Sequence, residues 1–85
     1  MAMTKKTTTT WTTPPVNEAF QAARTEFIQA ALTAGKTDSA EAHIEANDVG
    51  SRNWSNTTAA NEWIAFLESQ CAAANLVQTT TLTSI

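Results

Sequence analysis

The sequence predicts an α+β protein with a ferredoxin-like sandwich, in which two helices lie on one face of a four-stranded antiparallel sheet. Two observations lead to this prediction. A pattern of apolar residues with helical spacing occurs twice, and each copy follows a Trp that precedes a hydroxyl residue. Threonine-rich segments, which favour strands over helix interiors, flank the two helical patterns. The main alternative is the same pair of helices on a smaller and less regular sheet.

The two helical patterns have identical spacing, and each contains an Asn-Glu pair, at Asn17-Glu18 and at Asn61-Glu62. Residues at this spacing share one helix face, so we expect each set to be buried against the sheet. The first set is Val16, Ala19, Phe20, Ala23, Phe27 and Ala30, and the second is Ala60, Trp63, Ile64, Leu67, Cys71 and Ala74. We therefore predict a single domain over residues 1–85 with an internal duplication, whose units are at about 4–46 and 51–85.

The first unit begins with a predicted strand over Thr4 to Thr13, a run that is rich in threonine. Pro14-Pro15 ends this strand and opens a helix, because proline is tolerated in a first turn whose N–H groups have no helical partner. We expect Thr13 to cap this helix. The helix should run to about Ala34, because Gly35 readily adopts the left-handed conformation that ends a helix.

A hairpin is predicted between the two helices. Strict alternation of apolar and polar residues over Ser39 to Ala46 favours a strand over the short helix that Ala and Glu also permit. The turn-forming residues Asn47 to Gly50 then lead into a returning strand at Ser51 to Ser55.

The second unit supplies the remaining helix and strand. Side-chain oxygens at residues 55–58 begin a helix that runs to about Ala74, where Asn75 is the expected cap. Leu76 to Ile85 forms the last strand. The order is thus β-α-β-β-α-β, and right-handed crossovers place strands one and three in the centre, with strands one and four side by side.

Composition limits the classes of function. A net charge of -3 and a hydrophobic fraction of 42% over 85 residues indicate a folded core in one small domain. With five basic residues, of which Lys5-Lys6 is the one adjacent pair, we expect no binding to nucleic acid. Cys71 is the only cysteine, so no disulfide can form within one chain. We expect neither a membrane span nor a secretion signal at residues 1–6.

The sheet face opposite the helices has no predicted element to cover it. The strand order brings Thr7 to Thr10 beside Thr79 to Thr83, which predicts a flat, weakly polar array of threonines. Three interpretations of this face remain open. It is solvated, or it packs against the sheet of another copy in a homo-oligomer, or it binds ordered water, for which two strands make a small array.

Few residues suggest chemistry. His43 lies between Glu41 and Glu45 on one predicted strand face, a set that suits a general base or metal ligands but is more typical of a solvated polar face. Cys71 is expected to be buried and unreactive. Residues 34–37, Ala-Gly-Lys-Thr, match the end of a phosphate-binding loop, but the earlier glycine is missing and a helix precedes them. We therefore assign no catalytic, cofactor-binding or metal-binding residue.

Residues 51–55, Ser-Arg-Asn-Trp-Ser, precede a helix with the sequence Asn-Glu-Trp-Ile-Ala-Phe-Leu at residues 61–67. This arrangement resembles small uncharacterised proteins of tailed bacteriophages, especially T-even-like phages of cyanobacteria. Those proteins pair an Arg-x-Trp strand with an Ala-rich helix that carries a Glu–aromatic pair. The resemblance covers Ser51 to Glu68, and it implies a phage origin and a place in the infected host's cytoplasm or in the virion. It carries over no site residue.

Together these observations predict a non-enzymatic interaction or structural module, encoded by a phage, that self-associates through the open sheet face or a strand edge. Its expected partners are further copies of itself and an unknown protein, and no cofactor is expected. The alternative is a small dimeric ferredoxin-like barrel enzyme that uses His43 as acid or base. That alternative needs His43 to face the helices, whereas the alternation places Ala42 and Ile44 there.

Overall fold

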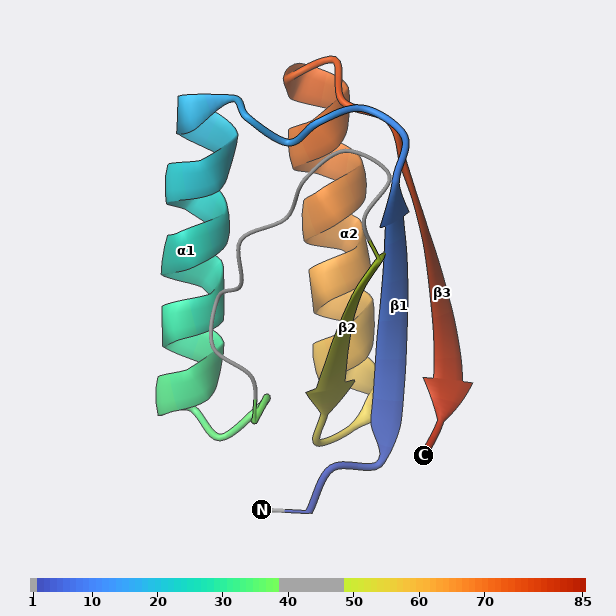
Figure 1. The fold of residues 1–85 in the computed structure, drawn as a ribbon. Coiled ribbons are helices and arrows are strands. Elements are labelled where there is room, and N and C mark those ends of the chain that lie inside the picture. Colours follow the sequence, from blue (N-terminus) through green and yellow to red (C-terminus); the bar gives the residue numbers. More distant parts are fainter. Residues whose placement is uncertain (1, 39–48) are drawn as a thin grey trace.

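The computed structural model describes residues 2–38 and 49–85. Figure 1 shows that the two helices of these segments lie on the same side of a sheet. In chain order the elements are β1 (Lys5–Trp11), α1 (Glu18–Thr33), β2 (Val49–Trp54), α2 (Thr57–Ala73) and β3 (Gln78–Ser84). The α+β class that the sequence predicts is therefore correct.

β1 is the middle strand of the sheet. The strand order is β2-β1-β3, and both neighbours run antiparallel to β1. The register opposes Thr7 to Arg52 on one side and to Leu82 on the other. Because side chains alternate across a strand, Thr7, Thr9 and Trp11 share one face, and all three are buried. The expectation that the first and last strands lie side by side is confirmed.

The predicted four-stranded ferredoxin-like sheet is wrong, because the described residues form a sheet of three strands. The sequence places a further strand at Ser39 to Ala46, and that segment lies outside the described residues. The sequence also predicts that the strand at Ser51 to Ser55 is central. In the described sheet this strand, β2, lies beside β1 on one side only. On its other side, the pairing among the described residues is an isolated bridge between Trp54 and Thr37. Alternation within a segment indicates where its side chains point, but it does not determine which strand the segment pairs with.

α1 begins later than the sequence predicts. Its N-cap is Asn17, whose side-chain oxygen accepts a hydrogen bond from the Phe20 N–H at 2.9 Å, and not Thr13. The two prolines instead precede the helix, where the Val16 N–H donates to the Pro14 carbonyl at 2.9 Å. Asparagine ranks above threonine as an N-cap, which favours the later start.

The buried face of α1 is rotated from the predicted one. The buried residues are Phe20, Arg24, Ile28 and Ala31. The exposed members of the predicted stripe are Val16, Ala19 and Ala30. Alanine gains little from burial, so an alanine-rich helix permits several stripes, and large side chains such as Phe20 and Ile28 decide which face is buried.

α2 agrees with the prediction more closely. Of its predicted stripe, the buried members are Ala60, Trp63, Leu67 and Cys71, and the half-buried ones are Ile64 and Ala74. Its N-cap is Asn56, within the predicted range of residues 55–58. Both helices end at the predicted left-handed residues, Gly35 with φ of 71° and Asn75 with φ of 56°.

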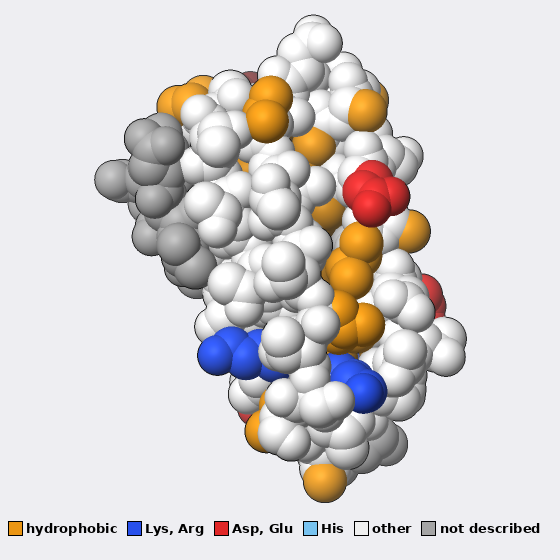
Figure 2. Space-filling view, turned by 90° about the vertical axis from the view of Figure 1, so that its right-hand side faces the viewer, with side chains coloured by type: hydrophobic (Ala, Val, Ile, Leu, Met, Phe, Trp, Pro, Cys, Tyr) orange, Lys and Arg blue, Asp and Glu red, His pale blue; other side chains and the backbone are white. Residues whose placement is uncertain are grey.

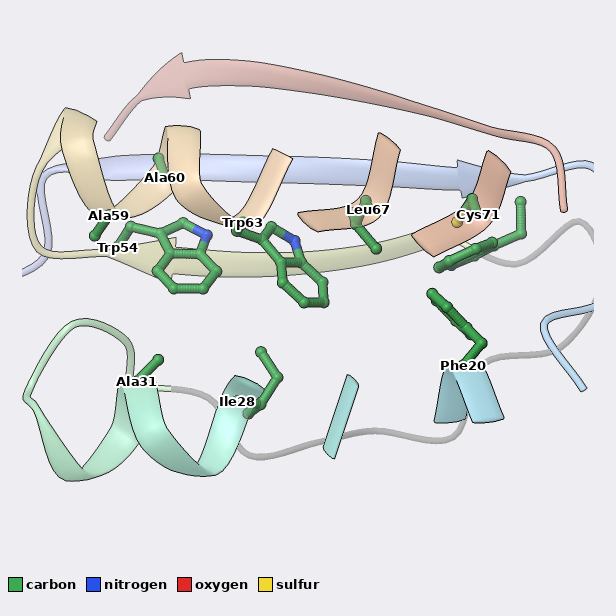
Figure 3. Close-up of a cluster of buried hydrophobic side chains, with 10 residues drawn as sticks. Phe20, Ile28, Ala31, Trp54, Ala59, Ala60, Trp63, Leu67 and Cys71 are labelled. Carbon is green, nitrogen blue, oxygen red and sulfur yellow. The ribbon is translucent and has the colours of Figure 1, made fainter. Parts of the chain in front are cut away.

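A cluster of aromatic rings joins α1 to α2 and to the sheet. Trp54 of β2 and Trp63 of α2 lie side by side, with ring centroids 5.8 Å apart (Figure 3). Phe27 of α1 lies 6.5 Å from the Trp54 ring and 5.5 Å from the Trp63 ring. Ile28 and Ala31 of α1 face the same two indoles (Figure 3). These side-chain contacts therefore attach α1 to the rest of the molecule.

Replacing Ile28 tests the observed face of α1. Ile28 is 0% exposed, so Ile28→Ala should lower the free energy of unfolding by about 3 kcal/mol. The matched change Val16→Ala should alter it by less than about 0.5 kcal/mol, because Val16 is 67% exposed. Urea denaturation followed by tryptophan fluorescence measures both. A larger loss for Val16→Ala would contradict the observed face and support the one that the sequence predicts.

Candidate functional site

The sheet face turned away from the helices is the candidate functional surface. We call it the open face, and its described side chains are those of Lys6, Thr8, Thr10, Ser51, Asn53, Thr79, Thr81 and Thr83. The register arranges them in rows across the strands, so that Thr8 stands between Ser51 and Thr81. Most of these side chains are exposed.

The open face is nearly neutral and carries short hydroxyl side chains. Apart from Lys6 and Asn53, all its members are Thr or Ser. Figure 2 shows the side of the molecule on which β3 lies, where a broad area is neither hydrophobic nor charged and a strip of hydrophobic side chains runs along one margin. Threonine has few side-chain conformers, so packing another molecule against these side chains costs them little conformational entropy.

The other threonines of β1 belong to the core. The Trp54 indole N–H donates a hydrogen bond to Thr7 Oγ1 at 2.9 Å, and both residues are buried. The hydroxyls of Thr9 and Thr80 lie 3.0 Å apart, and the Thr80 hydroxyl also contacts Gln78 Oε1. The predicted juxtaposition of the two threonine runs is confirmed, but Thr7, Thr9 and Thr80 lie on the helix side and not in the open array.

Two arginines are buried on the helix side, which is uncommon for a charged residue. Arg24 is 3% exposed, and its guanidinium carbon lies 5.4 Å from the centre of the Phe20 ring. Arg52 is 6% exposed, and its guanidinium carbon lies 5.4 Å from the centre of the Trp63 ring. The negative face of each ring attracts the cation, which partly offsets the loss of water around the charge.

Sequence reasoning missed both buried arginines, although the spacing holds a signal for each. Arg24 has helical spacing to Phe20 on one side and to Ile28 on the other, so it belongs to the buried stripe of α1. Arg52 has strand spacing to Trp54, so both side chains point to the same face. Arginine is rarely fully buried, so its presence at these spacings is not by itself a sign of the core.

Cys71 is buried in the core, as the sequence predicts. Burial raises the pKa of its thiol to about 11, although the charge of Arg24 partly opposes this shift. The thiol is therefore protonated at neutral pH. It lacks the thiolate character that a nucleophile or a metal ligand needs.

The remaining sequence candidates form no site within the described residues. His43, Glu41 and Glu45 lie outside them. In segment 34–37, Lys36 forms an ion pair with Glu62 of α2 at 3.4 Å. Over residues 2–38 and 49–85, no three His, Cys, Asp or Glu side chains gather as the ligands of a metal ion would.

A pocket of about 210 Å³ adjoins the Lys36–Glu62 ion pair. It is lined by Phe27, Ala30, Ala31, Lys36, Trp54, Ala59 and Glu62. Its walls are aromatic rings and methyl groups, and its two charged groups neutralise each other. The pocket is therefore a small, mostly apolar recess beside an ion pair.

No protein-family model, curated protein or solved structure matches the chain. Among the helices of the described segments, none combines the length and the apolar character that crossing a membrane requires.

The hydrogen bond between Trp54 and Thr7 can be tested by removing its acceptor. Thr7→Val keeps the shape of the side chain but leaves the buried indole N–H without a partner, so the free energy of unfolding should fall by about 1–3 kcal/mol. Thr8→Val is the matched control, because Thr8 points to the open face and the same change there should cost less than about 0.5 kcal/mol. Urea denaturation measures both variants, and equal losses would contradict a role for this bond.

Proposed function

We propose that this protein is a non-enzymatic interaction module that self-associates through its sheet, by the open face or by a strand edge. One observation carries the proposal. Both helices pack on the face of the sheet that holds Arg52 and Trp54, and no described element covers the open face (Figure 1). An uncovered sheet face is a common surface for packing against another sheet.

The chemistry of the sheet supports contact between identical copies. Lys6 is the one charged side chain of the open face, so two such faces repel each other weakly. Threonines on neighbouring or facing strands pack and hydrogen-bond with one another, as Thr9 and Thr80 do inside the molecule. A chain of 85 residues buries a smaller fraction of its surface than a larger one, so association adds stability to a small core.

No observation favours the alternative of a dimeric barrel enzyme. That reading requires a four-stranded sheet, whereas the described residues form three strands. It also depends on His43, which lies outside the described residues. Within them, the Cys71 thiol is protonated at neutral pH because its pKa is raised to about 11 by burial.

The biological setting that we propose follows from the resemblance of Ser51 to Glu68 to small proteins of tailed phages. A self-associating module without catalytic groups suits a component of the virion. It suits equally an accessory protein that acts in the cytoplasm of the infected cell. An unknown protein of the host or of the virion is then a further partner.

Self-association predicts a mass in solution that depends on concentration. The chain has a mass of 9.1 kDa, and we expect light scattering coupled to size exclusion to show twice this value or more as the concentration rises from about 10 to 500 μM. Mass action on a reversible contact causes this increase. A mass that stays at 9.1 kDa throughout the range would refute self-association.

A further inference from the structure

We propose that two copies of this chain join through the outer edges of their β3 strands, antiparallel and centred on Thr81, so that their sheets become one. This inference rests on the proposed self-association, and it names the surface and the register of that contact. It depends on the open hydrogen-bonding groups of the β3 edge, on the composition of the strand, and on two exposed hydrophobic side chains that flank it.

The outer edge of β3 has no strand partner among the described residues, because β3 pairs there with β1 alone. Bonds at the two ends of this pairing show which backbone groups point inward. The Thr12 N–H donates to the Val77 carbonyl at 3.0 Å, and the Ile85 N–H donates to the Thr4 carbonyl at 3.1 Å. Val77 and Ile85 are therefore residues whose backbone groups point toward β1.

The alternation of an antiparallel ladder extends this result along the strand. Thr79, Thr81 and Thr83 also direct their N–H and C=O groups toward β1. The intervening residues direct theirs to the outer edge, and these are Gln78, Thr80, Leu82 and Ser84. The edge thus offers a complete row of donors and acceptors to an added strand.

β3 itself lacks the features that keep strand edges apart, although Lys5 of β1 donates a hydrogen bond to Ser84 Oγ at 2.9 Å near one end of the strand. Charged side chains, proline and bulges are the usual protection. The strand reads Gln-Thr-Thr-Thr-Leu-Thr-Ser, its register with β1 is unbroken, and residues 69–85 contain no charged side chain. The opposite side of the sheet differs, because β2 carries Arg52 and is bordered by the bridge between Trp54 and Thr37. The edge of β3 is therefore the one suited to pairing.

Two exposed hydrophobic side chains set the register and identify the occupant. Val77 is 57% exposed and Ile85 is 67% exposed, and Thr81 lies midway between them in the sequence. Antiparallel pairing centred on Thr81 places Val77 opposite the partner's Ile85 and Ile85 opposite the partner's Val77. Both halves of this apolar contact come from the same two residues, so the surface is complementary to a second copy of the chain.

The same register suits the other side chains. On the open face, Thr81 meets the partner's Thr81, and Thr79 meets the partner's Thr83. On the helix side, Thr80 meets the partner's Leu82. Leu82 is partly buried at the margin of the core, and the added strand covers more of it. No pair brings two like charges together.

Disulfide trapping tests the register. Thr81 is opposite itself in a pair without mutual hydrogen bonds, where the two Cα atoms are about 4.5 Å apart, a distance that a disulfide spans. Thr81→Cys should therefore form a covalent dimer under mild oxidation. Thr83→Cys is the matched control on the same exposed face, since the two copies of residue 83 are about 13 Å apart, beyond the reach of a disulfide. Cys71 is buried and is present in both variants.

We expect Thr81→Cys to cross-link about tenfold faster than Thr83→Cys at a concentration where the unmodified chain is dimeric. Adding Ser51→Arg should leave this difference unchanged, because Ser51 lies on the open face of β2, on the far side of β1 from the β3 edge. Circular dichroism confirms that each variant is folded before oxidation.

Equal cross-linking rates for the two variants in a dimeric sample would overturn the β3 register and leave the proposed self-association standing. Loss of cross-linking on adding Ser51→Arg would overturn it too, in favour of contact through the open face. A chain that is monomeric at every concentration would refute both the register and the proposed function.

Discussion

The burial of Trp11 on the helix side of β1 is the constraint on which the arrangement of the sheet depends. On the same side of β1, the Trp54 indole N–H donates to Thr7 Oγ1 at 2.9 Å and joins β2 to β1 inside the core. A shift of one residue would bring Thr8 inward as an equivalent acceptor, but it would turn Trp11 out of the core and onto the open face. Because β1 is the middle strand, its orientation sets that of both neighbours. The composition of the open face thus follows from the residues of β1 that the core buries.

Threonine serves two purposes in this fold. On the helix side, Thr7 and Thr9 satisfy buried polar groups, and Thr9 does so together with Thr80 of β3. On the open face, Thr8 and Thr81 form a neutral surface that tolerates both water and another strand. Larger apolar side chains at these outer positions would create an exposed apolar patch, whereas a charged side chain at Thr81 would oppose the proposed pairing of β3 edges. The repetition of one residue type is therefore compatible with both a folded monomer and the proposed pairing.

The sequence predicts the local elements better than their assembly. The threonine runs, the stripe of α2 and the left-handed caps at Gly35 and Asn75 are all found, because strand propensity, large apolar side chains and cap chemistry act locally. The stripe of α1 is not found, because alanines blur the pattern and the buried Arg24 contradicts the usual rule. Strand pairing is a long-range property, so alternation could not determine the number of strands. Of the candidate surface, the sequence predicts the open threonine array but not the symmetric placement of Val77 and Ile85.

Hydrogen exchange at the backbone amides of β3 tests the central claim most directly. The N–H groups of Thr80 and Leu82 point to the outer edge, where the proposed pairing would bond them to the second copy, whereas that of Thr81 bonds to β1 in monomer and dimer alike. We predict that amide exchange at Thr80 and Leu82 slows about tenfold when the protein concentration rises from about 10 μM to about 1 mM. Exchange at Thr81 should change only as much as global unfolding of the protein changes. Rapid exchange at Thr80 and Leu82 in a sample that is dimeric by mass would contradict pairing through β3.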